Sequence, residues 1–147
     1  MDTQKLRVRL RKLNDTVKDL RELPRQTLEE YLQDRQRQAV VERWLQIGAQ
    51  ICIDTGASLI AELGLKAPDE LSNIFTTLGE AGVIPKRLTS RIVGITRFRN
   101  ILVHEYLTID PVIVYERWTK GLGDFDDFGR AIIEFIEKQE SGGEDNA

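Results

Sequence analysis

Apolar side chains recur every three or four positions through most of the chain, which is the spacing of amphipathic α-helices. Pro24 ends the first predicted helix, whose apolar positions are Leu6, Leu10, Leu13, Val17 and Leu20. Thr27 and Glu30 have the spacing of a capping box, which predicts a short helix. A longer helix follows it and ends at Gly64.

The second half of the chain continues the helical pattern between turn-forming residues. We expect a short helix over 71–78, a turn over 79–85, and a helix that begins at Pro85 and reaches about His104. Asp110 and Pro111 predict the N-cap and first residue of a final helix. Its apolar stripe consists of Tyr115, Trp118, Leu122, Phe125, Phe128, Ile132 and Phe135. Gly121 and Gly123 weaken this helix locally.

The predicted fold class is all-α, an antiparallel helical bundle of four to five helices. Helices of these lengths with short connections favour that packing. A chain of 147 residues with 41% hydrophobic content is sized for one domain with one core. We therefore expect a single domain over 1–140, followed by a flexible polar, glycine-rich tail over 141–147.

Composition and charge exclude several classes of protein. No apolar run approaches the roughly 18 residues that a membrane span needs, and the start lacks a signal-peptide core, so we expect a cytoplasmic protein with no membrane partner. One cysteine and one histidine cannot build a disulfide or a zinc site, and no phosphate-loop or dinucleotide motif occurs, so neither metal nor cofactor is expected. Cys52 is interpreted as core packing.

The charge is unevenly distributed along the chain. Residues 1–104 contain 17 Lys and Arg against 13 Asp and Glu, whereas residues 105–147 contain 4 against 11. The net charge of −3 argues against nonspecific wrapping of nucleic acid by the whole chain, but not against a local basic surface. The acidic run Asp124, Asp126 and Asp127 is interpreted as a solvated face of the last helix.

One arginine interrupts an apolar stripe in the helix predicted over 85–104. At about 100° per residue, Arg99 lies among Leu88, Ile92, Ile95 and Leu102. A buried guanidinium is costly unless it is paired, so Arg99 requires a carboxylate, a phosphate or a nearby helix end. Asp54 is the candidate internal partner, because it continues an apolar line of the long helix. That line contains Val40, Trp44, Ile47 and Ile51.

His104 is the candidate proton carrier, because histidine exchanges protons near neutral pH. Asn100 and Arg97 share a polar edge with it on the helical projection. Taken alone, His104 also suits an ordinary capping role. Arg99 and His104 are about 140° apart on an ideal helix. The helix therefore ends or bends here, Arg99 reaches around it, or the productive pair forms between two protomers.

The run from Arg99 to Tyr106, Arg-Asn-Ile-Leu-Val-His-Glu-Tyr, resembles the Arg-x4-His-x-Tyr signature of HEPN-domain toxins, in particular the HepT family. The resemblance extends to residues 34–64, to the stretch AGVIPKRL before the motif helix, and to the closing segments DPVIVYERW and DFDDFGRAI. It covers nearly the whole chain and implies a HEPN-like bundle.

The resemblance implies a homodimeric, metal-independent endoribonuclease toxin that cleaves RNA by attack of the 2′-hydroxyl. Arg99 would contact the scissile phosphate, His104 would exchange protons, and Asn100 would orient either group, with Asp54 and Arg97 in supporting roles. The family also implies a partner, an MntA-type nucleotidyltransferase antitoxin that silences the enzyme by transferring AMP to Tyr106. Transfer RNA and messenger RNA are both compatible substrates.

Two other hypotheses stay open on the residues alone. In the first, the chain is a non-catalytic HEPN partner or substrate-binding subunit of a nucleotidyltransferase. In the second, it is a dimeric scaffold in which Arg99 and Asp54 join two helices. A complete set of Arg99, Asn100 and His104 weighs against the first, because a non-catalytic partner has no need for all three and an arginine on an apolar stripe is then an unforced cost. Arg99→Lys separates the second from a ribonuclease, since lysine keeps the charge but loses the fork.

Overall fold

The computed structural model describes residues 1–145, and within them the chain is all-α, as predicted. In chain order the helices are α1 (Thr3–Glu22), α2 (Leu28–Leu32), α3 (Arg35–Glu62), α4 (Ile74–Glu80), α5 (Lys86–Ile92), α6 (Gly94–His104), α7 (Pro111–Lys120) and α8 (Gly123–Asp145), with a 3₁₀ turn η1 (Leu71–Asn73) before α4. None of the helices in residues 1–145 is long and apolar enough to cross a membrane.

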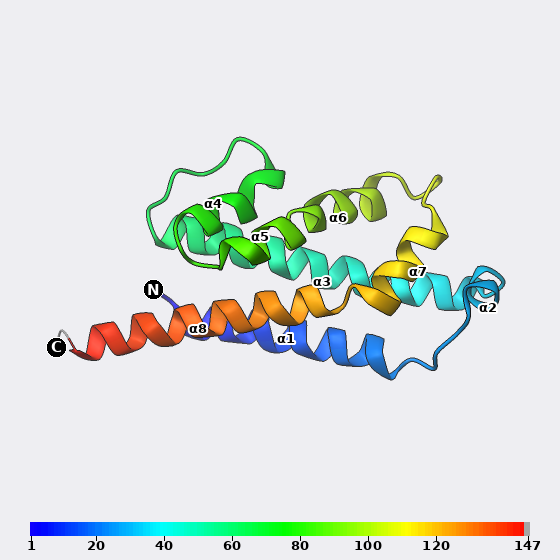
Figure 1. Ribbon diagram of the computed structural model, residues 1–147, viewed down its shortest axis with the longest axis horizontal. Helices are drawn as coiled ribbons and strands as arrows, with labels where there is room; N and C mark the ends of the chain where they lie inside the picture. Colours follow the sequence, from blue (N-terminus) through cyan, green and yellow to red (C-terminus); the bar gives the residue numbers. More distant parts are fainter. Residues whose placement is uncertain (146–147) are drawn as a thin grey trace.

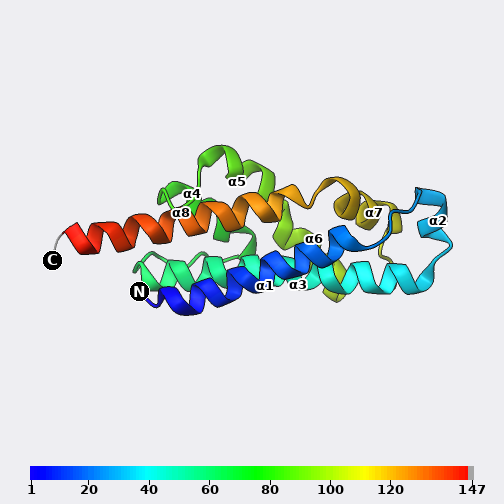
Figure 2. The same ribbon diagram turned by 90° about the horizontal axis from the view of Figure 1, so that it is seen from below.

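The long helix α3 forms the centre of the bundle. It packs against α1 and against α6, and α1 also packs against α8. Figures 1 and 2 show α1 running antiparallel to both α3 and α8, with α6 on the other side of α3 from α1. The start of α1 and the end of α8 lie at one end of the bundle, and α2, α7 and the α6–α7 connection lie at the other (Figure 1).

Local sequence signals set several of the helix ends. The Thr27 hydroxyl accepts from the Glu30 backbone N–H, and the Glu30 carboxylate accepts from the Thr27 backbone N–H, which completes the predicted capping box. Gly64 follows α3 with φ 67°, a left-handed conformation that glycine adopts without strain. Asp110 caps α7 through the Val112 backbone N–H. These boundaries agree with the sequence analysis.

Two predicted helices are each broken into two. The helix expected from Pro85 to His104 is interrupted at Val93, and the last predicted helix is interrupted between Lys120 and Gly123. The first break lets α5 pack against α4 and α8 while α6 packs against α3. The prediction of four to five helices is therefore too low, although α1, α3, α6 and α8 form the expected bundle.

The C-terminal boundary also differs from the prediction. Helix α8 continues through 141–145, where a flexible tail was predicted to begin. The polar composition of this segment does not end the helix, because a helix already under way needs few apolar residues to continue for one more turn. The rest of the predicted tail, residues 146–147, lies outside the described residues.

The acidic run at the start of α8 is half-buried, not a solvated face as predicted. Arg91 on α5 donates to Asp124 at 2.8 Å and to Asp127 at 2.7 Å. Arg21 on α1 pairs with Asp126. These ion pairs connect α8 to two neighbouring helices, so the carboxylates are structural.

The core is continuous through the bundle and contains several aromatic side chains. Phe128 on α8 is fully buried and meets Phe75 of α4 edge to face, with ring centroids 5.6 Å apart. Tyr31, Tyr115 and Trp118 form a second aromatic group between α2 and α7. Side chains far apart in sequence thereby join the short helices to the bundle.

We expect Phe128→Ala to lower the free energy of unfolding by about 3–5 kcal/mol, because it leaves a cavity beside Phe75 in a core with little room to collapse. The melting temperature would fall by roughly 6–20 °C. Glu137→Ala, on an exposed position of the same helix, is the control and should change stability by less than about 0.5 kcal/mol. Equal melting temperatures for the two variants would contradict the packing described here.

Candidate active site

Arg99 lies on α6 and its side chain is half-buried against α3. Its Nε donates to the Oε1 atom of Gln50 at 2.7 Å, and its Nη1 donates to the Oδ1 atom of Asn100 at 2.9 Å. Both acceptors are neutral amides. Among the described residues no carboxylate forms an ion pair with Arg99, so its positive charge is not compensated within the chain.

The predicted contact between Arg99 and Asp54 is wrong, because Gln50 lies between them. Asp54 is exposed and accepts from Gln50 Nε2 at 2.8 Å. This bond directs the carbonyl oxygen of the same amide to Arg99. Asp54 therefore contacts Arg99 only through Gln50.

The buried face of α3 is also displaced by one position from the predicted line, since Val41 and Leu45 are buried whereas Val40 and Trp44 are half-buried.

Gln50 is the site residue that the sequence analysis missed. A glutamine on a helix carries no charge that would mark it against the surrounding pattern. Its one local signal is the spacing of four residues to Asp54, which allows a side-chain contact on a helix. Its contact with Arg99 spans 49 residues of sequence and depends on the packing of α3 against α6.

The predicted polar edge of α6 is only partly assembled. Asn100 is half-buried and holds Arg99, whereas Arg97 and His104 are exposed. Within the described part of the chain, Asn100 makes no hydrogen bond to His104. Asn100 is thus placed to fix the guanidinium, and Arg97 is free to meet a ligand from solvent.

His104 is the last residue of α6, which confirms that the helix ends at this point. The next residue, Glu105, donates its backbone N–H to the Ile101 carbonyl as the C-cap. His104 therefore presents an exposed imidazole, while Arg99 on the preceding turn faces α3.

Tyr106 lies in the connection between α6 and α7 and is 71% exposed. The neighbouring Leu107 is 84% exposed, and a turn bond from the Thr108 N–H to the Glu105 carbonyl at 2.9 Å shapes the segment. In Figure 1 this segment projects at the end of the bundle beside α7. The Tyr106 side chain is therefore open to solvent.

The arrangement places a fixed cation, an exposed imidazole and an exposed phenol on the second half of α6 and the segment that follows it. A guanidinium held by two amide oxygens retains donors for a phosphate and matches its geometry. Residues 1–145 contain no group of His, Cys, Asp and Glu that would hold a metal ion. Burial raises the pKa of the Cys52 thiol well above its ordinary value, so this side chain is unsuited to nucleophilic attack.

Comparisons with known proteins identify the family of this chain. The family model described as Ribonuclease HepT-like matches residues 13–132. The chain is 27% identical over 133 residues to the tRNA nuclease HepT of Aphanizomenon flos-aquae (strain 2012/KM1/D3), covering 89% of each chain. Because the family model matches most of the chain, this protein belongs to the HepT-like ribonuclease family.

Two solved structures share the fold. The cytosolic protein YutE of Bacillus subtilis, described as of unknown function, has a TM-score of 0.81 at 18% identity, covering 95% of this chain and 93% of its own. The tri-AMPylated HEPN toxin of Shewanella oneidensis, solved in complex with an MNT antitoxin, has a TM-score of 0.78 at 23% identity, covering 88% and 96%. At these identities the likeness establishes the HEPN fold of this chain.

Proposed function

We propose that this protein is a ribonuclease toxin that cleaves RNA without a metal ion, with Arg99, Asn100 and His104 as its catalytic residues. The observation that carries the proposal is the half-buried Arg99 guanidinium, which is held by two amide oxygens. An arginine that served only to join two helices would be neutralised by a carboxylate, because an unpaired charge near the core is costly. An uncompensated but fixed cation instead suits an anionic ligand.

The chemistry follows from these groups. The 2′-oxygen of the ribose attacks the adjacent phosphorus and loses its proton to an imidazole acting as base. The bond from phosphorus to the 5′-oxygen breaks, and that oxygen takes a proton as it leaves. The products are a 2′,3′-cyclic phosphate and a 5′-hydroxyl. Arg99 stabilises the charge that develops on the phosphate oxygens, and Asn100 and Gln50 hold its orientation.

The active site is proposed to form between two copies of the chain. Arg99 and His104 lie about 140° apart on a regular helix, so the His104 of a partner copy can reach the phosphate from the opposite side. A two-fold interface brings both copies of each residue into one cleft. The half-buried apolar line Val40, Trp44, Ile47 and Ile51 on α3, beside Gln50, supports an interface on this face.

Regulation by AMP transfer is proposed at Tyr106. The phenolic oxygen would attack the α-phosphorus of ATP, lose its proton and release pyrophosphate. The added phosphate would lie two residues from His104, where it would compete with RNA for Arg99. The exposure of Tyr106, together with that of Leu107 and Ile113, supports a docking point for a nucleotidyltransferase antitoxin. The Shewanella oneidensis relative was solved in complex with an antitoxin, named MNT.

The test is incubation of purified, unmodified protein with RNA in EDTA, followed by analysis of the fragment ends. Transfer RNA is the first substrate to use, because the 27% identical relative is named a tRNA nuclease. Cleavage with cyclic phosphate ends supports the proposal. Intact RNA from a protein whose Tyr106 carries no AMP, as shown by mass spectrometry, would favour a non-catalytic binding subunit.

Tyr106→Phe should keep RNA cleavage within about twofold of wild type while abolishing neutralisation by the antitoxin, because only the acceptor oxygen is removed. The measurement is RNA cleavage after incubation with the antitoxin and ATP. Tyr115→Phe is the matched control, since its hydroxyl is bonded to the Gln26 carbonyl within the fold, and it should still be silenced. Loss of cleavage by Tyr106→Phe before any AMP transfer would contradict a purely regulatory tyrosine.

A further inference from the structure

The first helix carries a cationic surface that the catalytic site does not use. Helix α1 contains seven Lys and Arg against three Asp and Glu, in a chain with a net charge of −3. Arg7, Arg11, Lys18 and Arg21 are separated by four, seven and three residues, so they follow one line along the helix. We call these four residues the α1 stripe.

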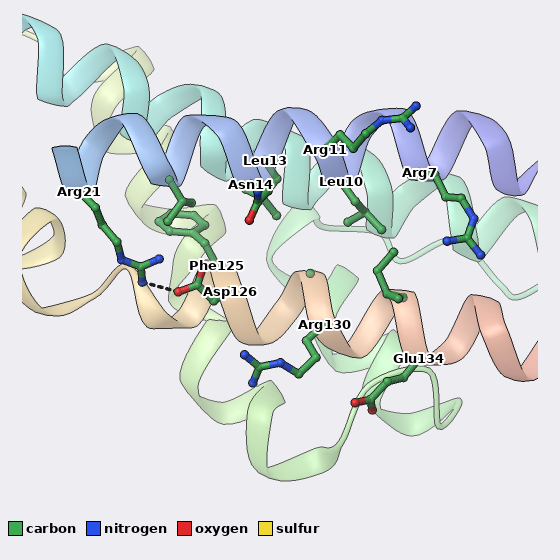
Figure 3. Close-up of a pocket in the computed structure, with 13 residues that line it drawn as sticks. Arg7, Leu10, Arg11, Leu13, Asn14, Arg21, Phe125, Asp126, Arg130 and Glu134 are labelled. Carbon is green, nitrogen blue, oxygen red and sulfur yellow. Dashed lines mark hydrogen bonds and ion pairs between the residues drawn. The ribbon is translucent and has the colours of Figure 1, made fainter.

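The α1 stripe borders a groove between α1 and α8. The groove has a volume of about 740 Å³, and its floor includes the buried side chains of Leu13 and Phe125. Gly129 on α8 leaves room for the groove, because glycine has no side chain that would extend toward Leu13. Figure 3 shows Arg7, Arg11 and Arg21 following one another along α1, with α8 facing them.

Arginines are the most numerous charged side chains that line this groove. Four arginines line it against two carboxylates, Asp126 and Glu134. Arg21 is paired with Asp126, Arg7 with Glu140 at 3.0 Å and Arg130 with Asp127 at 3.4 Å. In the α1 stripe, Lys18 is also paired, with Glu22 at 4.0 Å. Arg11 is exposed and has no ion pair among the described residues. Part of the charge is therefore available to an external anion.

The cationic surface continues beyond the end of α1. A second hollow of about 680 Å³ shares Arg21 with the first and is lined by Arg25 and Lys120. From Arg7 to Arg21 the stripe extends over roughly 21 Å at the helical rise per residue. A linear array of this length matches a linear polyanion better than it matches a single phosphate group.

We propose that the α1 stripe and the α1–α8 groove bind the sugar–phosphate backbone of the RNA substrate at a distance from the cleavage site. This inference rests on the proposed ribonuclease function. Arginine forks match phosphate oxygens, and the apolar floor accepts ribose or base surface. Because α3 lies between α1 and α6, the surface contacts a part of a folded RNA remote from the scissile bond.

The test compares two double variants with the same change in net charge. Arg11→Glu with Arg25→Glu alters the proposed surface, and neither side chain has an ion pair in the described chain. Lys5→Glu with Lys12→Glu is the matched control, because both are exposed positions of α1 off the stripe. Each pair is made in the wild-type chain and in the His104→Ala chain, which serves for binding without cleavage.

Binding to transfer RNA is measured over a range of salt concentrations. Arg11→Glu with Arg25→Glu should weaken binding on the order of tenfold and reduce the salt slope by roughly one to two units, as two phosphate contacts are lost. The control pair should stay near wild type. Cleavage of a short oligonucleotide that spans only the catalytic cleft should be equal in all proteins that retain His104.

The outcomes separate the two proposals. Suppose that wild type cleaves RNA, but Arg11→Glu with Arg25→Glu binds transfer RNA as tightly as the control pair does. The surface proposal is then wrong and the ribonuclease proposal stands. If wild type cleaves neither transfer RNA nor the short oligonucleotide, the ribonuclease proposal fails. Weaker RNA binding by Arg11→Glu with Arg25→Glu, but not by the control pair, would still support RNA binding at the α1–α8 groove. If Arg11→Glu with Arg25→Glu binds RNA normally but no longer associates with a nucleotidyltransferase antitoxin, the groove binds an acidic protein and the proposal of RNA binding is overturned.

Discussion

Replacing His104 by alanine is expected to lower the rate of RNA cleavage about 10²- to 10⁴-fold. His104 is the one histidine of the chain and lies exposed at the end of α6. Its removal leaves the proposed site without a side chain that both accepts and donates protons near neutral pH. The measurement is single-turnover cleavage of transfer RNA in EDTA, with fragment ends analysed for cyclic phosphates.

Protein folding provides the control for this prediction. The exposed position of His104 means that His104→Ala should change the free energy of unfolding by less than about 0.5 kcal/mol. Thr108→Ala, an exposed change in the same connection, should leave both stability and cleavage close to wild type. Undiminished cleavage by His104→Ala would exclude it as the proton carrier and overturn the proposed mechanism.

Arg99→Lys is expected to lower the rate of cleavage about 10²- to 10³-fold while the protein stays folded. Lysine keeps the charge but loses the fork. It therefore cannot bond to Gln50 and Asn100 and present aligned donors to a phosphate at the same time. Cleavage rates at saturating RNA and thermal unfolding of the same samples measure the two effects separately.

Two further variants show whether Arg99 acts on the reaction or on the fold. Arg87→Lys, the same substitution at an exposed position of α5, should leave cleavage unchanged. Gln50→Leu should lower the cleavage rate without removing any catalytic group, because Arg99 loses the acceptor at 2.7 Å that fixes its Nε. If Arg99→Lys destabilises the protein strongly and retains cleavage per folded molecule, Arg99 is a structural residue.

The sequence alone predicted the all-α class, several helix ends and the segment that carries the candidate site. Amphipathic spacing, the Thr27–Glu30 capping box and Gly64 are local signals, and helix formation depends on neighbours within a few residues. The Arg99 to Tyr106 run is local too, and the end of α6 at His104 agrees with the prediction. The roles of its residues stay proposals until cleavage is measured.

Tertiary structure decided everything that depends on contacts between distant segments. Val93 interrupts a helical pattern because α5 and α6 pack against different neighbours, and no signal in the flanking residues specifies those neighbours. Arg99 takes Gln50 as its partner instead of Asp54, because the packing of α3 on α6 decides which side chain of α3 it meets. The α1–α8 groove likewise arises only when two helices more than 100 residues apart in sequence lie side by side.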